Sequence, residues 1–310
     1  RVAQPAEVFP LPGKITPARH DGRMRAVTRD GLSFDVVEHG PPDGDPVLLL
    51  HGFPQRASSW AGVAARLAAR GYRCVAPDQR GYSPRARPDD VRAYAADELV
   101  ADALAVLDAT VADQGGPSGR AHLVGHDWGA LVAWRLAARH PDRLRSLTAV
   151  SVPPPAALGA AMRTSGQALR LWYVLAIQPP GLVERIYRAG GRPFSPRFAA
   201  ALRGIGQSAA AAERDAAGMA DPAALTGALN WYRAIRFTRS AADPPVEVPT
   251  LFVWSDGDPA TGAPAALRAG EHVAAPFRFV ELRGVSHWIP DEAPGVLAEL
   301  VGRHAAAHPG

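Results

Sequence analysis

The chain has 310 residues, of which 47% are hydrophobic and 21% are charged, with a formal net charge of +4. This hydrophobic content is enough to bury a substantial core, so it excludes an intrinsically disordered chain. The basic residues are arginines dispersed among acidic residues, with Lys14 as the only lysine. Because no basic stripe stands out, we expect no nucleic-acid partner. The single cysteine, Cys74, excludes an internal disulfide and is compatible with a reducing, cytoplasmic location.

The sequence predicts neither a membrane partner nor a secretory signal. Its most apolar run, LWYVLAI, ends at Gln178 before two prolines, well short of the roughly 20 apolar residues that span a bilayer. Residues 1–23 precede the first methionine, Met24, and lack an apolar segment followed by a small-residue cleavage site. We therefore interpret residues 1–23 as an N-terminal extension outside the fold.

In chain order, the first predicted element is a hairpin over residues 24–40, because alternating apolar residues flank the turn dipeptide Asp30-Gly31. Short apolar runs then predict buried strands, and periodic segments between them predict helices. The strands are expected at 46–52, 73–78, 121–127, 146–152, 250–255 and 277–282, and the helices at about 58–70, 94–113 and 291–304. Strands that alternate with helices indicate an α/β fold with a mostly parallel sheet of eight strands, covered by helices on both faces.

The pattern changes between Val152 and Thr250, where prolines mark both ends and the interior is rich in Ala, Arg and Leu at helical spacing. We expect a helical lid over residues 153–244, inserted after the sixth predicted strand. The core domain then consists of residues 24–152 and 245–310.

The segment Gly125-His126-Asp127-Trp128-Gly129 lies where a predicted strand becomes a helix. A turn this sharp needs small residues two positions before and two positions after its centre, and it points the central side chain out of the sheet. Asp127 is therefore a candidate nucleophile. The alternative is an aspartate that only caps the following helix.

An acid and a histidine follow Asp127 in the chain order expected of a catalytic triad. Asp256 and Asp258 come directly after a strand, and His287 follows the last strand. We prefer Asp258 because it lies further into the loop, where it can reach an imidazole. His126 lies on the opposite side of the pleat from its neighbour Asp127, so we expect it to be structural.

A carboxylate nucleophile indicates a two-step reaction. An ionised Asp127 that displaces a leaving group at a saturated carbon forms an ester, which water deprotonated by His287 can hydrolyse. Asp258 would orient the imidazole. The oxyanion of the second step needs donors, for which the backbone N–H groups of Trp128 and Phe53 are the candidates.

The motifs HGFPQRASSW, DQRGYSP, GHDWGA, WSDGDP and GVSHWIP resemble, in this order, those of α/β-hydrolases in the epoxide hydrolase and haloalkane dehalogenase branch. The resemblance covers about residues 24–305. It implies the α/β-hydrolase fold and an aspartate nucleophile in either case, so the triad does not separate the two activities.

Two further segments resemble those that carry the lid tyrosines of epoxide hydrolases. YVLAIQPPG begins at Tyr173 and NWYR contains Tyr232. The resemblance implies that both hydroxyls bind and protonate the epoxide oxygen. Phe53 occupies a position at which haloalkane dehalogenases tend to carry Asn, which favours the epoxide reading. Tyr187 has no such motif, and we expect it to pack.

The substrate pocket is expected to be lined by Trp172, Trp231, Ile177 and Pro54, although the two tryptophans could equally form the core of the lid. Ala176 and Ile177 stand where aromatic residues are frequent in the family, which indicates a roomier pocket.

The sequence thus predicts an epoxide hydrolase that converts an epoxide and water into a 1,2-diol. No cofactor or metal is expected, because the ten histidines lack ligand spacing. The alternatives are a haloalkane or haloacid dehalogenase and a non-catalytic small-molecule-binding protein. The oligomeric state is left open, including a homodimer. The Arg-rich, Lys-poor composition favours a bacterial source.

Overall fold

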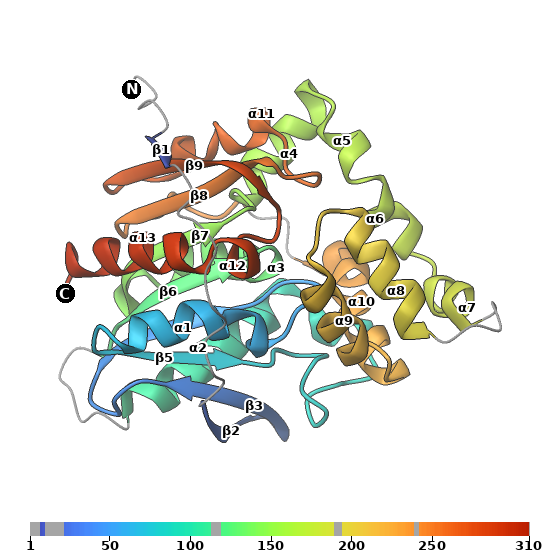
Figure 1. The fold of residues 1–310 in the computed structure, drawn as a ribbon, viewed down its shortest axis with the longest axis horizontal. Helices are drawn as coiled ribbons and strands as arrows, with labels where there is room; N and C mark the ends of the chain where they lie inside the picture. The colour runs from blue at the N-terminus through green and yellow to red at the C-terminus, as the bar shows by residue number, and fades with distance from the viewer. Residues whose placement is uncertain (1–6, 10–21, 113–118, 189–193, 239–241, 310) are drawn as a thin grey trace.

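The computed structural model describes residues 7–9, 22–112, 119–188, 194–238 and 242–309 (Figure 1). Nine strands form one sheet in the spatial order β1-β9-β8-β7-β6-β4-β5-β3-β2. They are β1 (Glu7–Phe9), β2 (Arg23–Arg29), β3 (Leu32–His39), β4 (Asp45–Leu50), β5 (Tyr72–Pro77), β6 (Ala121–His126), β7 (Leu144–Val150), β8 (Thr250–Gly257) and β9 (Phe277–Ser286). Only β3 pairs antiparallel, with β2 and with β5, and all the other pairings are parallel. The predicted mostly parallel α/β sheet is confirmed.

The ninth strand corrects the expectation that residues 1–23 lie outside the fold. Residues Glu7–Phe9 pair in parallel with Val280, Glu281 and Leu282 at the edge of the sheet. An edge strand of three residues is held by backbone hydrogen bonds and needs no hydrophobic alternation, so the sequence carries no signal for it. The other predicted strands are β2 to β9.

Helices cover both faces of the sheet, as expected. Along β4, Val47 and Leu49 belong to the apolar cluster of α1 and α13, whereas Leu48 and Leu50 belong to the cluster of α2 and α3. This alternation follows from the two-residue repeat of a strand. The helical elements outside the insertion are η1 (Ala57–Trp60), α1 (Ala61–Ala68), η2 (Val91–Tyr94), α2 (Ala96–Ala112), α3 (Trp128–Arg139), η3 (Pro141–Arg143), α11 (Ala263–Ala266), η5 (Ala269–His272), α12 (Ile289–Glu292) and α13 (Pro294–Ala306).

The last helix differs from its prediction, because the expected segment 291–304 is split into α12 and α13 at Ala293. Pro294 has no backbone N–H, and its ring clashes with the carbonyl four residues earlier in a continuous helix. Pro294 is instead accommodated in the first turn of α13.

The predicted insertion is entirely helical in its described residues. It contains α4 (Pro155–Thr164), α5 (Gln167–Arg170), α6 (Trp172–Ile177), α7 (Leu182–Arg188), α8 (Phe194–Gly204), α9 (Ala209–Gly218), α10 (Pro222–Ala234) and η4 (Ile235–Phe237). We call residues 153–244 the insertion. Figure 1 shows its helices gathered at one end of the sheet.

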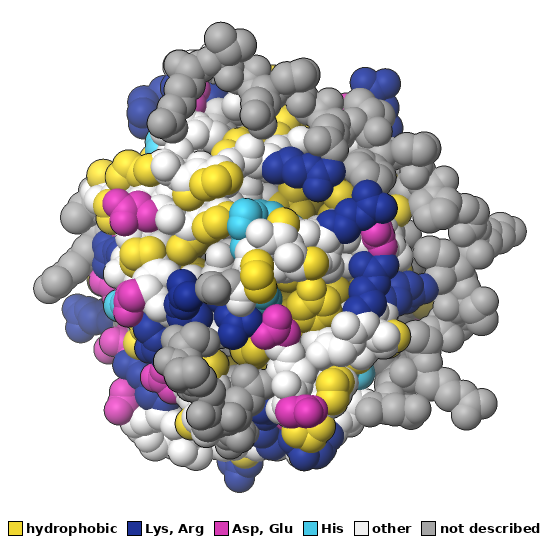
Figure 2. Space-filling view, turned by 90° about the vertical axis from the view of Figure 1, so that its left-hand side faces the viewer, with side chains coloured by type: hydrophobic (Ala, Val, Ile, Leu, Met, Phe, Trp, Pro, Cys, Tyr) yellow, Lys and Arg dark blue, Asp and Glu magenta, His cyan; other side chains and the backbone are white. Residues whose placement is uncertain are grey.

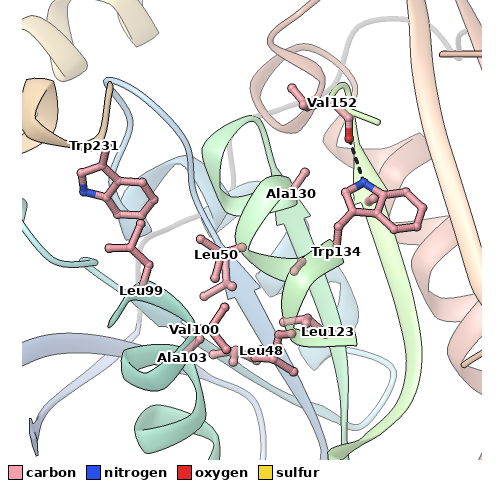
Figure 3. Packing of buried hydrophobic residues seen from close by; sticks show 14 of the residues in the cluster. Leu48, Leu50, Leu99, Val100, Ala103, Leu123, Ala130, Trp134, Val152 and Trp231 are labelled. Atoms are coloured by element: carbon pink, nitrogen blue, oxygen red, sulfur yellow. Dashed lines mark hydrogen bonds between the residues drawn. The ribbon is translucent and has the colours of Figure 1, made fainter. Parts of the chain in front are cut away.

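The apolar core continues from the sheet into the insertion. In Figure 3, Trp231 of α10 lies above Leu99 of α2, near Leu50 of β4. The indole N–H of Trp231 donates to the carbonyl of Arg80 at 2.8 Å. On the other side of this cluster, the indole N–H of Trp134 donates to the carbonyl of Val152 at 3.0 Å. The bond from Trp231 attaches α10 to the loop that follows β5, and the bond from Trp134 attaches α3 to the segment that follows β7.

No helix among the described residues is long and apolar enough to cross a membrane. Figure 2 shows the face of the molecule opposite the insertion, where Arg side chains alternate with Asp and Glu. This mixture agrees with the dispersed charges of the sequence.

Candidate active site

Asp127 occupies a strained turn between β6 and α3, with φ of 53° and ψ of −120°. A Cβ atom added to Gly125 would lie 2.3 Å from the carbonyl oxygen of Gly129, and one added to Gly129 would lie 2.1 Å from that of Leu50. Neither position has room for a larger residue, which is the requirement predicted for this turn. A non-glycine residue at positive φ costs about 1 to 3 kcal/mol and is concentrated at functional sites.

The Asp127 carboxylate receives a hydrogen bond from the backbone. Its Oδ1 accepts from the Phe53 N–H at 2.8 Å, and the Trp128 N–H at the start of α3 adds to the stabilisation of the ionised form. The side chain makes no capping hydrogen bond to α3, which argues against a role limited to helix capping. Of the two predicted oxyanion donors, the Phe53 N–H thus contacts the Asp127 side chain directly.

His287 lies between two carboxylates. Its Nε2 is 3.5 Å from Asp127 Oδ2, and its Nδ1 is 2.7 Å from Asp258 Oδ2. The other carboxylate oxygen of Asp258 accepts from the N–H groups of Ala260 and Thr261, at 2.7 and 2.9 Å. Residues that are distant in sequence therefore form one chain of polar contacts, in which the loop backbone fixes the orientation of Asp258.

These contacts favour the charged forms of both His287 and Asp127. Burial alone would lower the pKa of His287, but the charge of Asp258 and the hydrogen bond to Asp127 outweigh it and raise that pKa to about 10. Burial opposes ionisation of Asp127, yet the hydrogen bond and charge of His287 prevail and lower its pKa. At neutral pH the site therefore holds an ionised Asp127 beside a protonated His287.

The two other histidines near the site have structural contacts. His126 places Nδ1 2.9 Å from Gln55 Oε1 and Nε2 2.9 Å from the carbonyl of His287. His51 Nε2 accepts from the Gln79 N–H at 3.1 Å. Burial lowers the pKa of both histidines to about 4. As expected, His126 faces away from the carboxylate of its neighbour.

The rings of Tyr173 and Tyr232 pack against each other, with their centroids 6.1 Å apart. The Tyr232 ring also packs edge-on against Trp128 and Phe53, at centroid distances of 4.9 and 5.4 Å. Burial raises the pKa of both tyrosines, and the charge of Asp127 raises it further. Both phenols therefore carry their protons at neutral pH. Tyr187 packs on the ring of Phe198.

The predicted pocket residues fall into two groups. Pro54, Ile177 and Trp231 are buried, and the Trp231 ring lies 5.8 Å from that of Trp128. Trp172 is 66% exposed, which corrects its prediction as a pocket residue. Consecutive residues of a helix point about 100° apart, so the turn that directs Tyr173 inward directs Trp172 outward.

Two glutamines at the site were not predicted. Gln167 of α5 pairs with the loop that carries Asp258: its Nε2 donates to the carbonyl of Ala260 at 2.6 Å, and its Oε1 accepts from the Gly262 N–H at 2.9 Å. Gln55 links His126 to Asp291, which its Nε2 contacts at 2.7 Å. The only signal for Gln55 was its place in HGFPQ, directly after Pro54. No group of three or more His, Cys, Asp or Glu side chains suited to a metal ion occurs within the described residues.

Comparisons with known proteins agree with this geometry. A family model of the alpha/beta hydrolase fold matches residues 45–294. Epoxide hydrolase A of Mycobacterium tuberculosis is 34% identical over 309 aligned residues, which cover 87% of this chain and 93% of that protein. An AB hydrolase superfamily protein of Bacillus subtilis is 30% identical, over 90% of this chain and 96% of that protein.

Solved structures point to the same group. An epoxide hydrolase from Vigna radiata superimposes with a TM-score of 0.78 at 27% identity, covering 93% of this chain and 99% of that one. Epoxide hydrolase A from Mycobacterium thermoresistibile superimposes with a TM-score of 0.75 at 27% identity, covering 92% of this chain and 98% of that one. The chain therefore belongs to the α/β-hydrolase fold family, in its epoxide hydrolase branch.

Proposed function

We propose that the protein hydrolyses an epoxide to a 1,2-diol through a covalent ester on Asp127. The observation that carries the proposal is that His287 lies between two carboxylates, 2.7 Å from Asp258 and 3.5 Å from Asp127. Two phenols from the insertion lie close enough to Asp127 for its charge to raise their pKa values. A nucleophile, a base and acids for the leaving oxygen thus surround one point.

In the first step, the ionised Asp127 attacks one ring carbon from behind and the C–O bond of the epoxide breaks. The departing oxygen needs a proton as it becomes an alkoxide, and Tyr173 and Tyr232 hold theirs at neutral pH. One phenol transfers its proton and the other donates a hydrogen bond. The product of this step is a hydroxyalkyl ester of Asp127.

The ester changes the charge that His287 experiences. The carboxylate of Asp127 supports the protonated imidazole in the free enzyme, and ester formation removes that charge. The pKa of His287 then falls, so its proton can return through solvent to the tyrosinate. Neutral His287 can now deprotonate a water molecule that attacks the carbonyl carbon of Asp127. Ester formation itself therefore produces the base that the second step needs.

The second step places negative charge on the carbonyl oxygen of Asp127. The N–H of Phe53, already 2.8 Å from Asp127 Oδ1, and the N–H of Trp128 would stabilise this oxyanion. As the intermediate collapses, the leaving alkoxide takes up the proton still carried by the hydroxyl group that water added. The diol is released, and the ionised Asp127 and the protonated His287 are restored.

The contacts of Trp128 favour an epoxide over a haloalkane. A dehalogenase needs free N–H donors for the departing halide. The Trp128 indole instead packs edge-on against the ring of Tyr232, with the two ring centroids 4.9 Å apart. The group beside the indole is therefore a phenol, which can give a proton to a departing oxygen.

The insertion would serve as a lid domain above a core of residues 24–152 and 245–310. It supplies both phenols, from α6 and α10, while the core supplies the nucleophile and the base. Substrate would bind between the two, which excludes bulk water during ring opening.

The test is the intact mass of a His287→Gln variant after incubation with a mixed panel of epoxides and haloalkanes. Without its base the enzyme should stall at the ester, so we expect a mass gain equal to one whole epoxide, mapped to Asp127. An additional Asp127→Asn change should abolish the gain. A gain equal to a haloalkane minus hydrogen halide would identify a dehalogenase, and an epoxide adduct on another residue would refute the assigned nucleophile.

A further inference from the structure

Exposed apolar side chains are concentrated in the insertion. Nine large hydrophobic side chains are exposed among the described residues, and seven of them lie within residues 153–244. The seven are Met162, Leu169, Trp172, Leu175, Ile186, Ile205 and Ile235. The insertion makes up less than a third of the chain, so dispersion by chance does not account for this distribution.

Three of these side chains lie on the consecutive helices α5 and α6, and we call them the apolar ridge: Leu169, Trp172 and Leu175. They are 80%, 66% and 77% exposed. Trp172 and Leu175, three residues apart in α6, lie on one side of that helix, and Leu169 is exposed on α5 directly before it. Figure 1 shows α5 at the edge of the molecule, away from the sheet. The ridge is therefore a solvent-facing apolar surface in the chain as it stands.

Positive charge is concentrated in the same segment. Residues 153–244 contain eleven arginines against five acidic residues, whereas the rest of the chain contains 23 basic and 25 acidic residues. Arg163, Arg185 and Arg203 are exposed, and within the described residues their side chains form no ion pair or hydrogen bond. The insertion thus combines exposed apolar side chains with cations that lack a partner of opposite charge.

We propose that the apolar ridge docks on an anionic lipid surface. Exposed Leu and Trp side chains in an arginine-rich segment are typical of regions that lie in the headgroup layer of a bilayer, with the apolar groups inserted and the cations near lipid phosphates. The expectation of no membrane partner rested on the length needed to span a bilayer. Docking on the surface needs no such length.

The position of the ridge gives this docking a role. Tyr173 is flanked by Trp172, and Leu175 follows within the same short helix. The helix that carries one phenol of the candidate site therefore carries the ridge on its outer side. Docking would bring the insertion, and with it the phenols of the proposed site, to the surface from which an apolar substrate partitions. The docking itself does not depend on the proposed reaction.

Tryptophan fluorescence with bromine-labelled lipids tests the docking directly. Of the seven tryptophans, Trp172 is the one classed as exposed, while Trp60, Trp134, Trp231, Trp254 and Trp288 are buried and Trp128 is intermediate. Bromine on the acyl chains should quench Trp172 when the full-length protein meets vesicles of phosphatidylcholine and phosphatidylglycerol. Quenching should be several-fold weaker with phosphatidylcholine alone, and it should disappear in Trp172→Phe.

The chain offers matched controls for the ridge. A Leu169→Ser/Leu175→Ser variant should lose at least tenfold in vesicle affinity, whereas Met24→Ser/Leu267→Ser, which alters exposed apolar side chains outside the insertion, should bind like the unaltered protein. Asp127→Asn should also bind normally, which separates this proposal from the proposed reaction. Equal binding by the two double variants, or quenching that does not require anionic lipid, would overturn the proposal. Loss of a dimer in the ridge variant, without any lipid quenching, would instead assign the ridge to a second copy of the chain.

Discussion

His287 Nδ1 lies 2.7 Å from Asp258 Oδ2, whereas Asp256, two residues earlier, is exposed and accepts from the Gly284 N–H at 2.8 Å. Asp256 is the penultimate residue of β8 and Asp258 directly follows that strand, so sequence position alone gives either of them access to the histidine. Backbone contacts account for the difference between the two carboxylates. The N–H groups of Ala260 and Thr261 donate to Asp258 and hold its side chain toward the interior.

The contact between Asp258 and His287 gives the first prediction. Asp258→Asn keeps the size of the side chain but removes the charge that orients and supports the imidazole. We expect ester hydrolysis to slow by on the order of 10³ to 10⁴-fold, by analogy with the acid of serine-hydrolase triads. Rapid-quench mass spectrometry would follow the ester. Asp256→Asn is the matched control and should stay within a few-fold of the wild type. Equal losses in the two variants would remove Asp258 from its assigned role.

The two phenols give the second prediction. Each single change, Tyr173→Phe or Tyr232→Phe, should slow ring opening by about 10²-fold or more, the usual contribution of a positioned acid. The double variant should lose ring opening while it keeps its cooperative thermal unfolding. Tyr187→Phe is the control, because that tyrosine packs on Phe198 away from Asp127. Substantial turnover by a folded double variant would contradict the role of both hydroxyls.

The third prediction concerns pH. Ring opening needs ionised Asp127, whose pKa is lowered, and protonated tyrosines, whose pKa values are raised. Its rate should therefore be flat across neutral pH. Ester hydrolysis needs neutral His287, whose pKa is about 10 in the free enzyme and falls once the ester has removed the charge of Asp127. Lowering the pH protonates this base, so the ester should accumulate in acid. Single-turnover mass spectrometry from pH 5 to 9 measures both steps, and an ester population that rises with pH would contradict the order of events.

The sequence carried information about some parts of the site and not about others. Asp127 was identifiable because its turn needs glycine at two fixed positions, a requirement that the close contacts of Gly125 and Gly129 explain. The direction of the Trp172 side chain could not be predicted, because a helix of six residues is too short for periodicity to show which of its faces points inward. Mostly parallel pairing was predictable from the alternation of strands and helices, but the edge strand Glu7–Phe9 depends on backbone contacts alone.

Gln167 is the clearest example of a site residue without a sequence signal. Its side chain is buried and pairs with the backbone of Ala260 and Gly262, more than 90 positions later in the chain. Any polar residue can bind a backbone group, so no motif marks it. Arg170, one turn further along, donates to the carbonyl of Asp258 at 3.1 Å. Helix α5 of the insertion is thus attached to the loop that positions the triad acid.

This attachment gives the last prediction, in which Gln167 is a positioning residue. Gln167→Met keeps the volume and leaves the buried Gly262 N–H and the part-buried Ala260 carbonyl unpaired, which should cost about 1 to 3 kcal/mol in the free energy of unfolding. Because the loop also sets the direction of Asp258, ester hydrolysis should slow more than ring opening in single-turnover measurements. A purely structural role would reduce both rates by the same factor, through the folded fraction. Thr164→Val is the control, since its exposed hydroxyl contacts only the carbonyl of Ala160 in its own helix, and it should leave both rates unchanged.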